Sequence, residues 1–274
     1  MDAVSTAGDR RGRFHELHGA SSLFVMSNPW DVGSAKLLEA SGFEALATTS
    51  QGFAWTLGKR DMQVTRDELV AHVEQLAAAI KVPLAVDSER CFPDEPGGVA
   101  ETVRLLGEAG AAGFSIEDYD PATDRIADVS LSVERVAEAA EAARSFDPPL
   151  VLTGRAENHI RGVDDLDDTI ARLVAYRDAG ADCAYAPGLV VLEQIEAVVD
   201  AVGVPVNVLA LPMGPPVPEL AEVGVRRVST GSLLASAANA ALVAGARELL
   251  DEGSSRYAEE RVPRELLDAA FRPS

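Results

Sequence analysis

Two carboxylates follow one short apolar segment of the chain. Residues 82–94 read VPLAVDSERCFPD, so that Asp87 and Glu89 lie two residues apart where the apolar run ends. If this run is a strand, side chains two residues apart point to the same face, and both carboxylates are directed to one place. The segment is therefore our first candidate for a functional site.

Polar side chains also follow other apolar runs of the chain. They are Thr49, Ser50, Gln51, Gly52 and Asp61 at and after the end of one run, Glu117 and Arg155 toward the ends of two others, and Asn207 within a fourth. Oxygen ligands without histidine or cysteine suit a hard cation, and a few carboxylates with room for water suit Mg²⁺ best. Arg155 could bind a substrate carboxylate through two hydrogen bonds. We expect these residues to meet in one site.

The elements that must position these residues repeat along the chain. Eight short apolar runs, at 22–28, 44–50, 83–89, 113–118, 150–158, 183–188, 205–210 and 226–231, alternate with amphipathic helical segments. This alternation predicts an α/β fold, a (β/α)8 TIM barrel, whose catalytic groups lie at the carboxyl ends of the strands. A doubly wound sheet is the alternative, but SNPWDVGSA stands where its glycine-rich turn would be.

Length and composition limit the other possibilities. We predict one domain over residues 14–274 of the 274-residue chain, a loose tail over 1–13, and a helical extension from about residue 232. The net charge of −20 disfavours nucleic acid and membrane partners. No apolar run approaches the ~20 residues of a membrane helix, and the N-terminus has no apolar signal region. We therefore expect a cytoplasmic protein.

The ordered strand ends resemble those of one known superfamily. NPWDVGSAKLLEASGFEALATTSQGFAWTLGKRD, PLAVDSE, AAGFSIED, LTGRAEN, AGADCAYAPG, PVNVLA and GVRRVSTG occur in this order. Together they are similar to segments of the isocitrate lyase/phosphoenolpyruvate mutase superfamily, over about residues 14–245. The resemblance implies a barrel whose last helix is exchanged between subunits of a homodimer or homotetramer.

The resemblance also implies a role for each matching residue. Asp87 would bind Mg²⁺, with Mn²⁺ as an alternative, and Asp61, Glu89 and Glu117 would hold the metal mostly through water. Thr49, Ser50, Gln51 and Gly52 would hold a substrate carboxylate, Arg155 would clamp the substrate, and Asn207 would lie near its far end. Arg155, Glu117 and Asp61 are our catalytic candidates.

Two departures from the superfamily leave the reaction open. The lyase segment K-[KR]-C-G-H and the mutase loop K-x-N-S are both replaced by EDYDPATDRIADVSLS, and we expect residues 119–130 to form a lid. Our first hypothesis is an enzyme, a Mg²⁺-dependent lyase or decarboxylase that cleaves a carbon–carbon bond of a small 2-oxo or 2-hydroxy carboxylate through a metal-stabilised enolate. The alternatives are carbon–phosphorus chemistry on phosphonopyruvate and a non-catalytic protein that binds 2-oxo acids.

Overall fold

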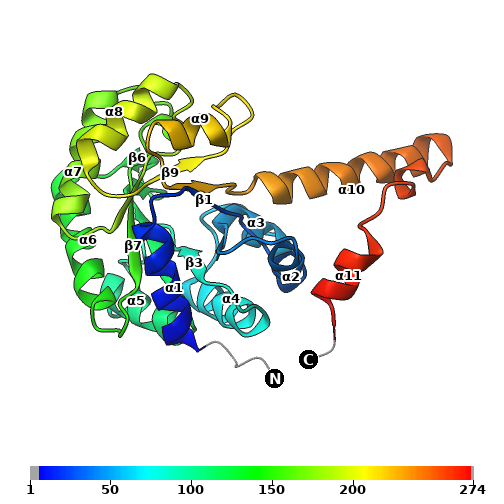
Figure 1. Cartoon of the computed structure of the whole chain (residues 1–274), viewed down its shortest axis with the longest axis horizontal. Helices are drawn as coiled ribbons and strands as arrows, with labels where there is room; N and C mark the ends of the chain where they lie inside the picture. Colours follow the sequence, from blue (N-terminus) through cyan, green and yellow to red (C-terminus); the bar gives the residue numbers. More distant parts are fainter. Residues whose placement is uncertain (1–5, 273–274) are drawn as a thin grey trace.

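Eight parallel strands form a barrel surrounded by helices in the computed structural model, which describes residues 6–272 (Figure 1). The strands are β1 (Phe24–Met26), β2 (Leu46–Ala47), β3 (Leu84–Asp87), β4 (Gly113–Glu117), β7 (Val151–Arg155), β8 (Cys183–Tyr185), β9 (Val206–Leu209) and β10 (Arg227–Ser229). They pair in the order β1-β10-β9-β8-β7-β4-β3-β2. A parallel bridge between Ser27 and Leu46 joins the first and last strands of this order. The predicted (β/α)8 barrel and its eight strands are confirmed.

The helices follow the strands in the predicted alternation. They are α1 (Ala7–Gly19), α2 (Val32–Ala40), α3 (Ser50–Thr56), α4 (Arg66–Ala79), α5 (Gly98–Glu108), α6 (Val129–Ala143), α7 (Leu166–Asp178), α8 (Leu192–Val202), α9 (Val217–Glu222), α10 (Leu233–Glu252) and α11 (Arg264–Ala270), with short 3-10 turns at η1 (His159–Arg161) and η2 (Arg256–Ala258). The segment predicted as a lid contains a hairpin of β5 (Tyr119–Asp120) and β6 (Arg125–Ile126).

Local capping explains where several helices begin. Thr65 and Glu68 form a reciprocal capping box at the start of α4, as the sequence TRDE indicates. The side chain of Thr49 accepts a hydrogen bond from the amide of Gly52 and so begins α3 directly after β2. The α3 cap therefore fixes the loop that we predicted to hold a substrate carboxylate.

The N-terminal segment corrects one prediction. Residues 7–13 belong to helix α1, so the boundary at residue 14 and the loose tail are wrong there, while residues 1–5 lie outside the described part of the chain. Thr6 and Asp9 form a capping box, and Phe14 and Leu17 are buried. Phe14 packs with Phe24 and Val151 in the lower barrel, and this packing anchors a helix whose composition is mostly polar.

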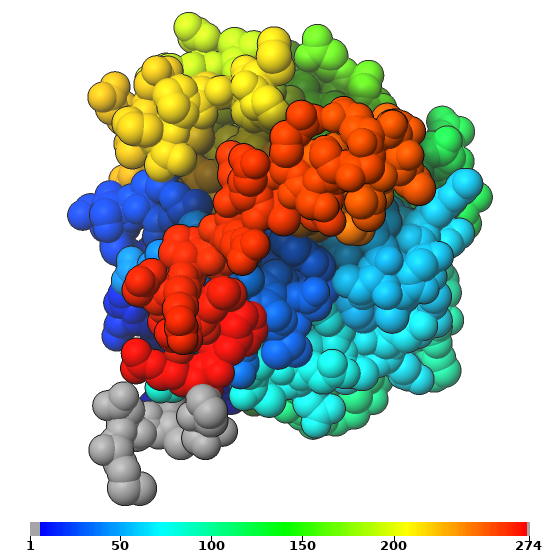
Figure 2. All heavy atoms as spheres, turned by 90° about the vertical axis from the view of Figure 1, so that its right-hand side faces the viewer, coloured from blue at the N-terminus to red at the C-terminus, as the bar shows by residue number. Residues whose placement is uncertain are grey.

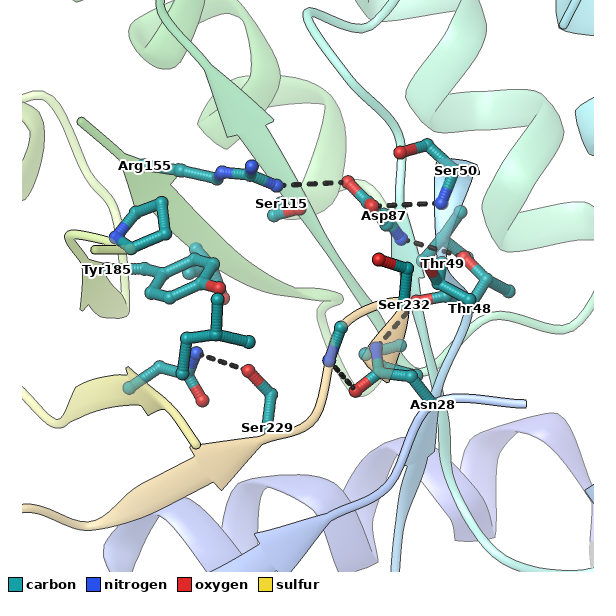
Figure 3. Close-up of a pocket in the computed structure, with 18 of the residues that line it drawn as sticks. Asn28, Thr48, Thr49, Ser50, Asp87, Ser115, Arg155, Tyr185, Ser229 and Ser232 are labelled. Atoms are coloured by element: carbon teal, nitrogen blue, oxygen red, sulfur yellow. Dashed lines mark hydrogen bonds and ion pairs between the residues drawn. The ribbon is translucent and has the colours of Figure 1, made fainter. Parts of the chain in front are cut away.

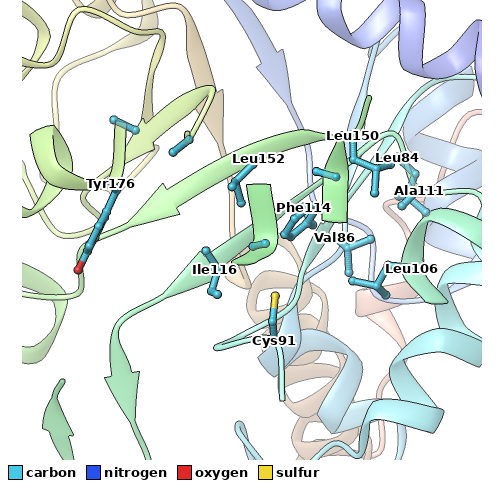
Figure 4. Close-up of a cluster of buried hydrophobic side chains, with 14 of the residues drawn as sticks. Leu84, Val86, Cys91, Leu106, Ala111, Phe114, Ile116, Leu150, Leu152 and Tyr176 are labelled. Carbon is cyan, nitrogen blue, oxygen red and sulfur yellow. The ribbon is translucent and has the colours of Figure 1, made fainter. Parts of the chain in front are cut away.

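The core lies on both faces of the barrel wall. Leu84, Val86, Ile116, Leu150 and Leu152 are almost wholly buried in the main cluster, which also includes residues of the surrounding helices (Figure 4). Strands covered on both faces have no solvent side, and this explains the nearly continuous apolar runs of the sequence.

The C-terminal helix α10 points away from the barrel, and α11 returns to pack against α2 (Figure 1). Figure 2 looks onto the far end of this arm.

The expectation that no segment reaches membrane-spanning length is wrong for α10. By length and composition alone, this helix is long and apolar enough to cross a membrane. Its apolar side chains are unusually exposed, with Leu242 70% and Leu250 84% accessible.

Candidate active site

A cavity of about 280 Å³ opens at the carboxyl ends of the strands and extends into the barrel (Figure 3). Seven of the predicted site residues line it, namely Thr49, Ser50, Gln51, Asp61, Asp87, Arg155 and Asn207. Gly52, Glu89 and Glu117 do not line it. Gly52 is needed for close packing instead, because a side chain would not fit there: its Cβ atom would lie 2.6 Å from Cγ2 of Thr49.

Asp87 is held at the end of β3 by groups from two other elements. Its Oδ2 accepts a hydrogen bond of 3.0 Å from the backbone amide of Ser50, and its Oδ1 lies 3.4 Å from Nη1 of Arg155 (Figure 3). Its own backbone amide donates to Oγ1 of Thr48 at 2.9 Å. The carboxylate is therefore fixed in one orientation at the wall of the cavity.

Arg155 is shared among three carboxylates. Its guanidinium lies 3.4 Å from Asp87, 3.2 Å from Glu117 and 2.5 Å from Glu157. Burial alone would lower the pKa of Arg155, but these carboxylates outweigh burial and raise the pKa well above its ordinary value. The ring of Tyr185 lies 5.3 Å from the guanidinium carbon. Arg155 is thus placed beside the cavity as predicted, with its charge already engaged by the protein.

The acidic side chains around Arg155 outnumber this one cation. Burial, followed by the charge of Asp87, raises the pKa of Asp61 and raises that of Glu89 to about 8. Burial also raises the pKa of Glu117 well above its ordinary value. Oδ1 of Asp61 and Oε1 of Glu117 are buried and have no hydrogen-bond partner. Buried oxygens without partners are costly, and a divalent cation would stabilise the ionised forms of these acids.

The described residues 6–272 contain no group of three acidic, histidine or cysteine side chains placed to hold a metal directly. Mg²⁺ in proteins usually keeps several waters and accepts carboxylate oxygens, which Asp61 and Asp87 offer at the cavity. These oxygens fit the chemistry of Mg²⁺, and the ligand roles that the resemblance implies stay predictions.

Three charged residues of the cavity were missed in the sequence. Glu157 is completely buried and bonds both Arg155 and Arg161, and Arg161 lies 3.4 Å above the ring of Tyr119. Glu157 follows Arg155 by two residues, so the strand period could have identified it. Arg227 lines the cavity from β10, and its sequence context RRVS carries no comparable signal.

Comparison with known proteins agrees with this geometry. The family model described as phosphoenolpyruvate phosphomutase matches residues 14–250. The chain belongs to this family. It is thus an enzyme of the isocitrate lyase/phosphoenolpyruvate mutase superfamily, which confirms the predicted membership.

Individual members of the superfamily resemble this chain over most of its length. An uncharacterized protein of Mycobacterium tuberculosis is 33% identical and covers 87% of this chain and 89% of its own. An oxaloacetate decarboxylase of Paraburkholderia xenovorans is 32% identical over 74% of this chain and 69% of its own. A crystal structure from Burkholderia cenocepacia, provisionally assigned as a lyase or mutase, is 47% identical with a TM-score of 0.91, covering 95% of this chain and 96% of its own.

Proposed function

We propose that this family member is a carbon–carbon lyase for a small 2-oxo or 2-hydroxy carboxylate, and that an oxaloacetate-like acid is decarboxylated at this site. The observation that carries the proposal is the pair of unpartnered oxygens, on Asp61 and Glu117, in the carboxylate cluster around Asp87 and Arg155. The chain lacks the K-[KR]-C-G-H segment of the superfamily lyases. Decarboxylation is compatible with this absence because the reaction can begin without an acid such as the cysteine of that segment. The 32% identity to an oxaloacetate decarboxylase supports the same choice.

Mg²⁺ is the cofactor that we infer for this reaction. Asp87 would hold it directly, and Asp61, Glu89 and Glu117 would hold it through water. When bound, Mg²⁺ acts as a Lewis acid that stabilises negative charge developing on substrate oxygens. The chain itself fixes Asp87 through the Ser50 amide, so that the ligand is oriented before the cation arrives.

The residues after β2 are placed to orient the substrate. Ser50 and Gln51 line the cavity at the beginning of α3, and Oε1 of Gln51 is fixed by a hydrogen bond of 2.6 Å from the hydroxyl of Ser232. Thr49 caps the helix and so keeps this loop in place. We infer that this loop and Arg155 position the substrate carboxylate, which lowers the barrier by orientation.

The test is pyruvate formation from oxaloacetate with Mg²⁺, after subtraction of the rate given by the metal alone. The variant Asp87→Asn keeps the shape of the side chain but removes its charge, and we expect its rate to fall by at least about 100-fold, as when a transition-state contact is removed. Asp94→Asn is the matched control, because Asp94 is 74% exposed and pairs only with Arg90. Equal turnover by wild type and Asp87→Asn would contradict the proposal.

Phosphonopyruvate is the second candidate substrate. A phosphonate needs more positive charge than one arginine supplies, and the cavity is lined by Arg155, Arg161 and Arg227. Release of phosphate or formation of phosphoenolpyruvate from phosphonopyruvate, without turnover of oxaloacetate, would favour this reading. Tight binding of 2-oxo acids without any product would instead favour the binding protein.

We also propose that the chain is a homodimer or homotetramer with exchanged C-terminal helices. The support is α10, which extends from the barrel with Leu242 and Leu250 largely exposed. We expect Leu242→Glu to lower the molar mass measured by light scattering after gel filtration. Val191→Glu is the control, since Val191 is an exposed apolar residue (45%) outside α10. An unchanged mass in Leu242→Glu would contradict helix exchange.

The cytoplasmic location stays a prediction.

A further inference from the structure

Arg227 is a buried cation without an acidic partner. It begins β10, is only 3% exposed, and lines the cavity. No ion pair joins it to a carboxylate within the described residues 6–272, whereas Arg155 contacts three. Because an unpaired buried charge is strongly unfavourable, its presence needs an explanation.

The neighbours of Arg227 are neutral but hold it firmly. Nε donates to Oδ1 of Asn207 at 3.0 Å, and Nη2 donates to Oγ1 of Thr153 at 3.0 Å. Nη1 lies 3.0 Å from Nε2 of His18. These contacts use three of the five N–H groups of a guanidinium, and two remain. The head group is therefore positioned from three elements while part of its hydrogen-bonding capacity is unused.

His18 acts as a neutral support for this arginine. Its Nδ1 lies 2.8 Å from the carbonyl oxygen of Phe14, which can only accept, so Nδ1 carries the proton and Nε2 accepts from Arg227. Burial, and then the charge of Arg227, lowers the pKa of His18 to about 3. The histidine thus orients the guanidinium and supplies no negative charge.

The position of Arg227 is deeper in the barrel than the carboxylate cluster. It bonds Thr153, which precedes Arg155 by two residues on β7, and at ~3.3 Å per residue this places the contact about 7 Å below Arg155 along the strand. The cavity is also lined by Ala47, Ala85 and Ser115, whose small side chains leave room in the barrel. Arg227 and this room lie in the same cavity as Asp87.

We propose that Arg227 is a specificity-determining residue that binds the distal carboxylate of a dicarboxylic substrate, whose reacting end lies at Asp87 and Arg155. This inference rests on the proposed function and deepens it. A guanidinium stabilises a carboxylate over neutral carbon dioxide, so the carboxylate bound here stays on a product. The reaction that fits is the lyase reaction at a carbon–carbon bond between the two ends: the 2-oxo end leaves as an enolate that takes up a proton, and a hydroxyl on the other side of the broken bond becomes the carbonyl of the second product. The depth of the site favours a chain of five carbons or slightly more, longer than oxaloacetate.

The test compares two five-carbon acids that differ only at the distal end, 2-oxoglutarate and 2-oxovalerate. Binding is measured by calorimetry with Mg²⁺ present, so that no turnover is required. We expect wild type to bind 2-oxoglutarate about 10- to 100-fold more tightly, as for a charge-assisted hydrogen bond. Arg227→Met should abolish this preference while 2-oxovalerate binding changes less than about threefold. Arg226→Met is the control, since Arg226 is adjacent but does not line the cavity.

A second variant keeps the test decisive if Arg227→Met fails to fold. Asn207→Asp places a carboxylate at the atom that already accepts from Nε of Arg227, and it should raise thermal stability by pairing the buried charge. The same change should remove the preference for 2-oxoglutarate. Because Asn207 lines the cavity itself, Arg227→Lys is measured beside it, since lysine keeps the charge. A preference that is lost in Asn207→Asp but kept in Arg227→Lys supports the role of Arg227.

The outcomes separate this inference from the function on which it rests. Equal binding of the two acids by wild type, or a preference that survives in Arg227→Met or Asn207→Asp, would overturn the role of Arg227 alone. Failure of wild type to bind either acid would overturn this inference, whereas turnover of oxaloacetate by the same preparation decides the proposed function separately.

Discussion

Replacing Arg155 with methionine should destabilise the protein strongly. The change leaves the buried Glu117 and Glu157 and the partly buried Asp87 without their shared cation, although the side chain keeps a similar length. Breaking a buried ion pair in this way costs about 3–5 kcal/mol of unfolding free energy. For a chain of this size, that loss corresponds to a melting temperature lowered by roughly 6–20 °C. Arg104→Met is the matched control, because its exposed ion pairs should contribute only about 0–1 kcal/mol.

The deficit of Arg155→Met should depend on pH with a defined sign. The pKa of Glu89 is raised to about 8, and that of Glu117 is also raised, by burial first. An acid whose folded pKa lies above its unfolded value binds more protons when folded, so stability falls as pH rises through that window. Loss of the arginine raises these pKa values further. The deficit should therefore be largest near pH 8.5 and should shrink toward pH 6.

The assay is thermal melting of wild type, Arg155→Met and Arg104→Met at both pH values, with EDTA or with Mg²⁺. Added Mg²⁺ should restore part of the lost stability, because a cation bound only by the folded state stabilises it by mass action. A melting temperature of Arg155→Met within about 2 °C of wild type at pH 8.5 in EDTA would refute the stabilising role of Arg155. A larger loss of melting temperature at pH 6 than at pH 8.5 would refute the predicted pH dependence.

Two further predictions concern the frame around the site. Thr6→Ala removes the cap of α1 and should lower the unfolding free energy by about 0.5–2 kcal/mol in urea titrations, whereas Thr6→Ser should not. Burial lowers the pKa of His72 to about 4, so the unfolded state binds the extra proton and wild-type stability should fall as pH drops below about 6.5. His72→Leu should lessen that acid sensitivity by up to about 1.4 kcal/mol per pH unit, and an unchanged pH profile would contradict a neutral buried imidazole.

The sequence was most informative where a local pattern of apolar residues determines the secondary structure. Each barrel strand is covered on both faces, so its apolar run marks its position, and the polar residue that ends the run lies at the cavity. Asp87 and Arg155 end β3 and β7 and could be placed for this reason, whereas Asn207 was placed by its polarity within an apolar run. The helix α1 was missed because its apolar residues are few, although T-x-x-D at Thr6 and Asp9 was a readable start signal.

The remaining features depend on contacts across the barrel, which no local pattern contains. Glu89 and Glu117 were predicted at the site, but they lie outside the cavity lining, and the backbone amide of Glu117 donates to the carbonyl of Glu89. Glu89 has φ of 50°, so the strand period that placed it beside Asp87 no longer applies there. Arg227 reaches Thr153 and His18, which are far away in the sequence. These contacts exist only in the folded barrel, so no local sequence pattern indicates the role that we propose for Arg227.

Arg155 and Arg227 lie toward opposite ends of the cavity, and the charges of their neighbours differ. Arg155 is surrounded by several acidic side chains, and we propose that the upper end binds a cation. Within residues 6–272 Arg227 has only neutral partners, and we propose that the lower end binds an anion. In the low dielectric of the barrel such opposite preferences are not cancelled by solvent. A bound acid is then oriented by charge, with its reacting end toward the cation site and its second carboxylate directed into the barrel. Pairing the charge of Arg227 by Asn207→Asp should therefore remove this orientation without disturbing the upper site.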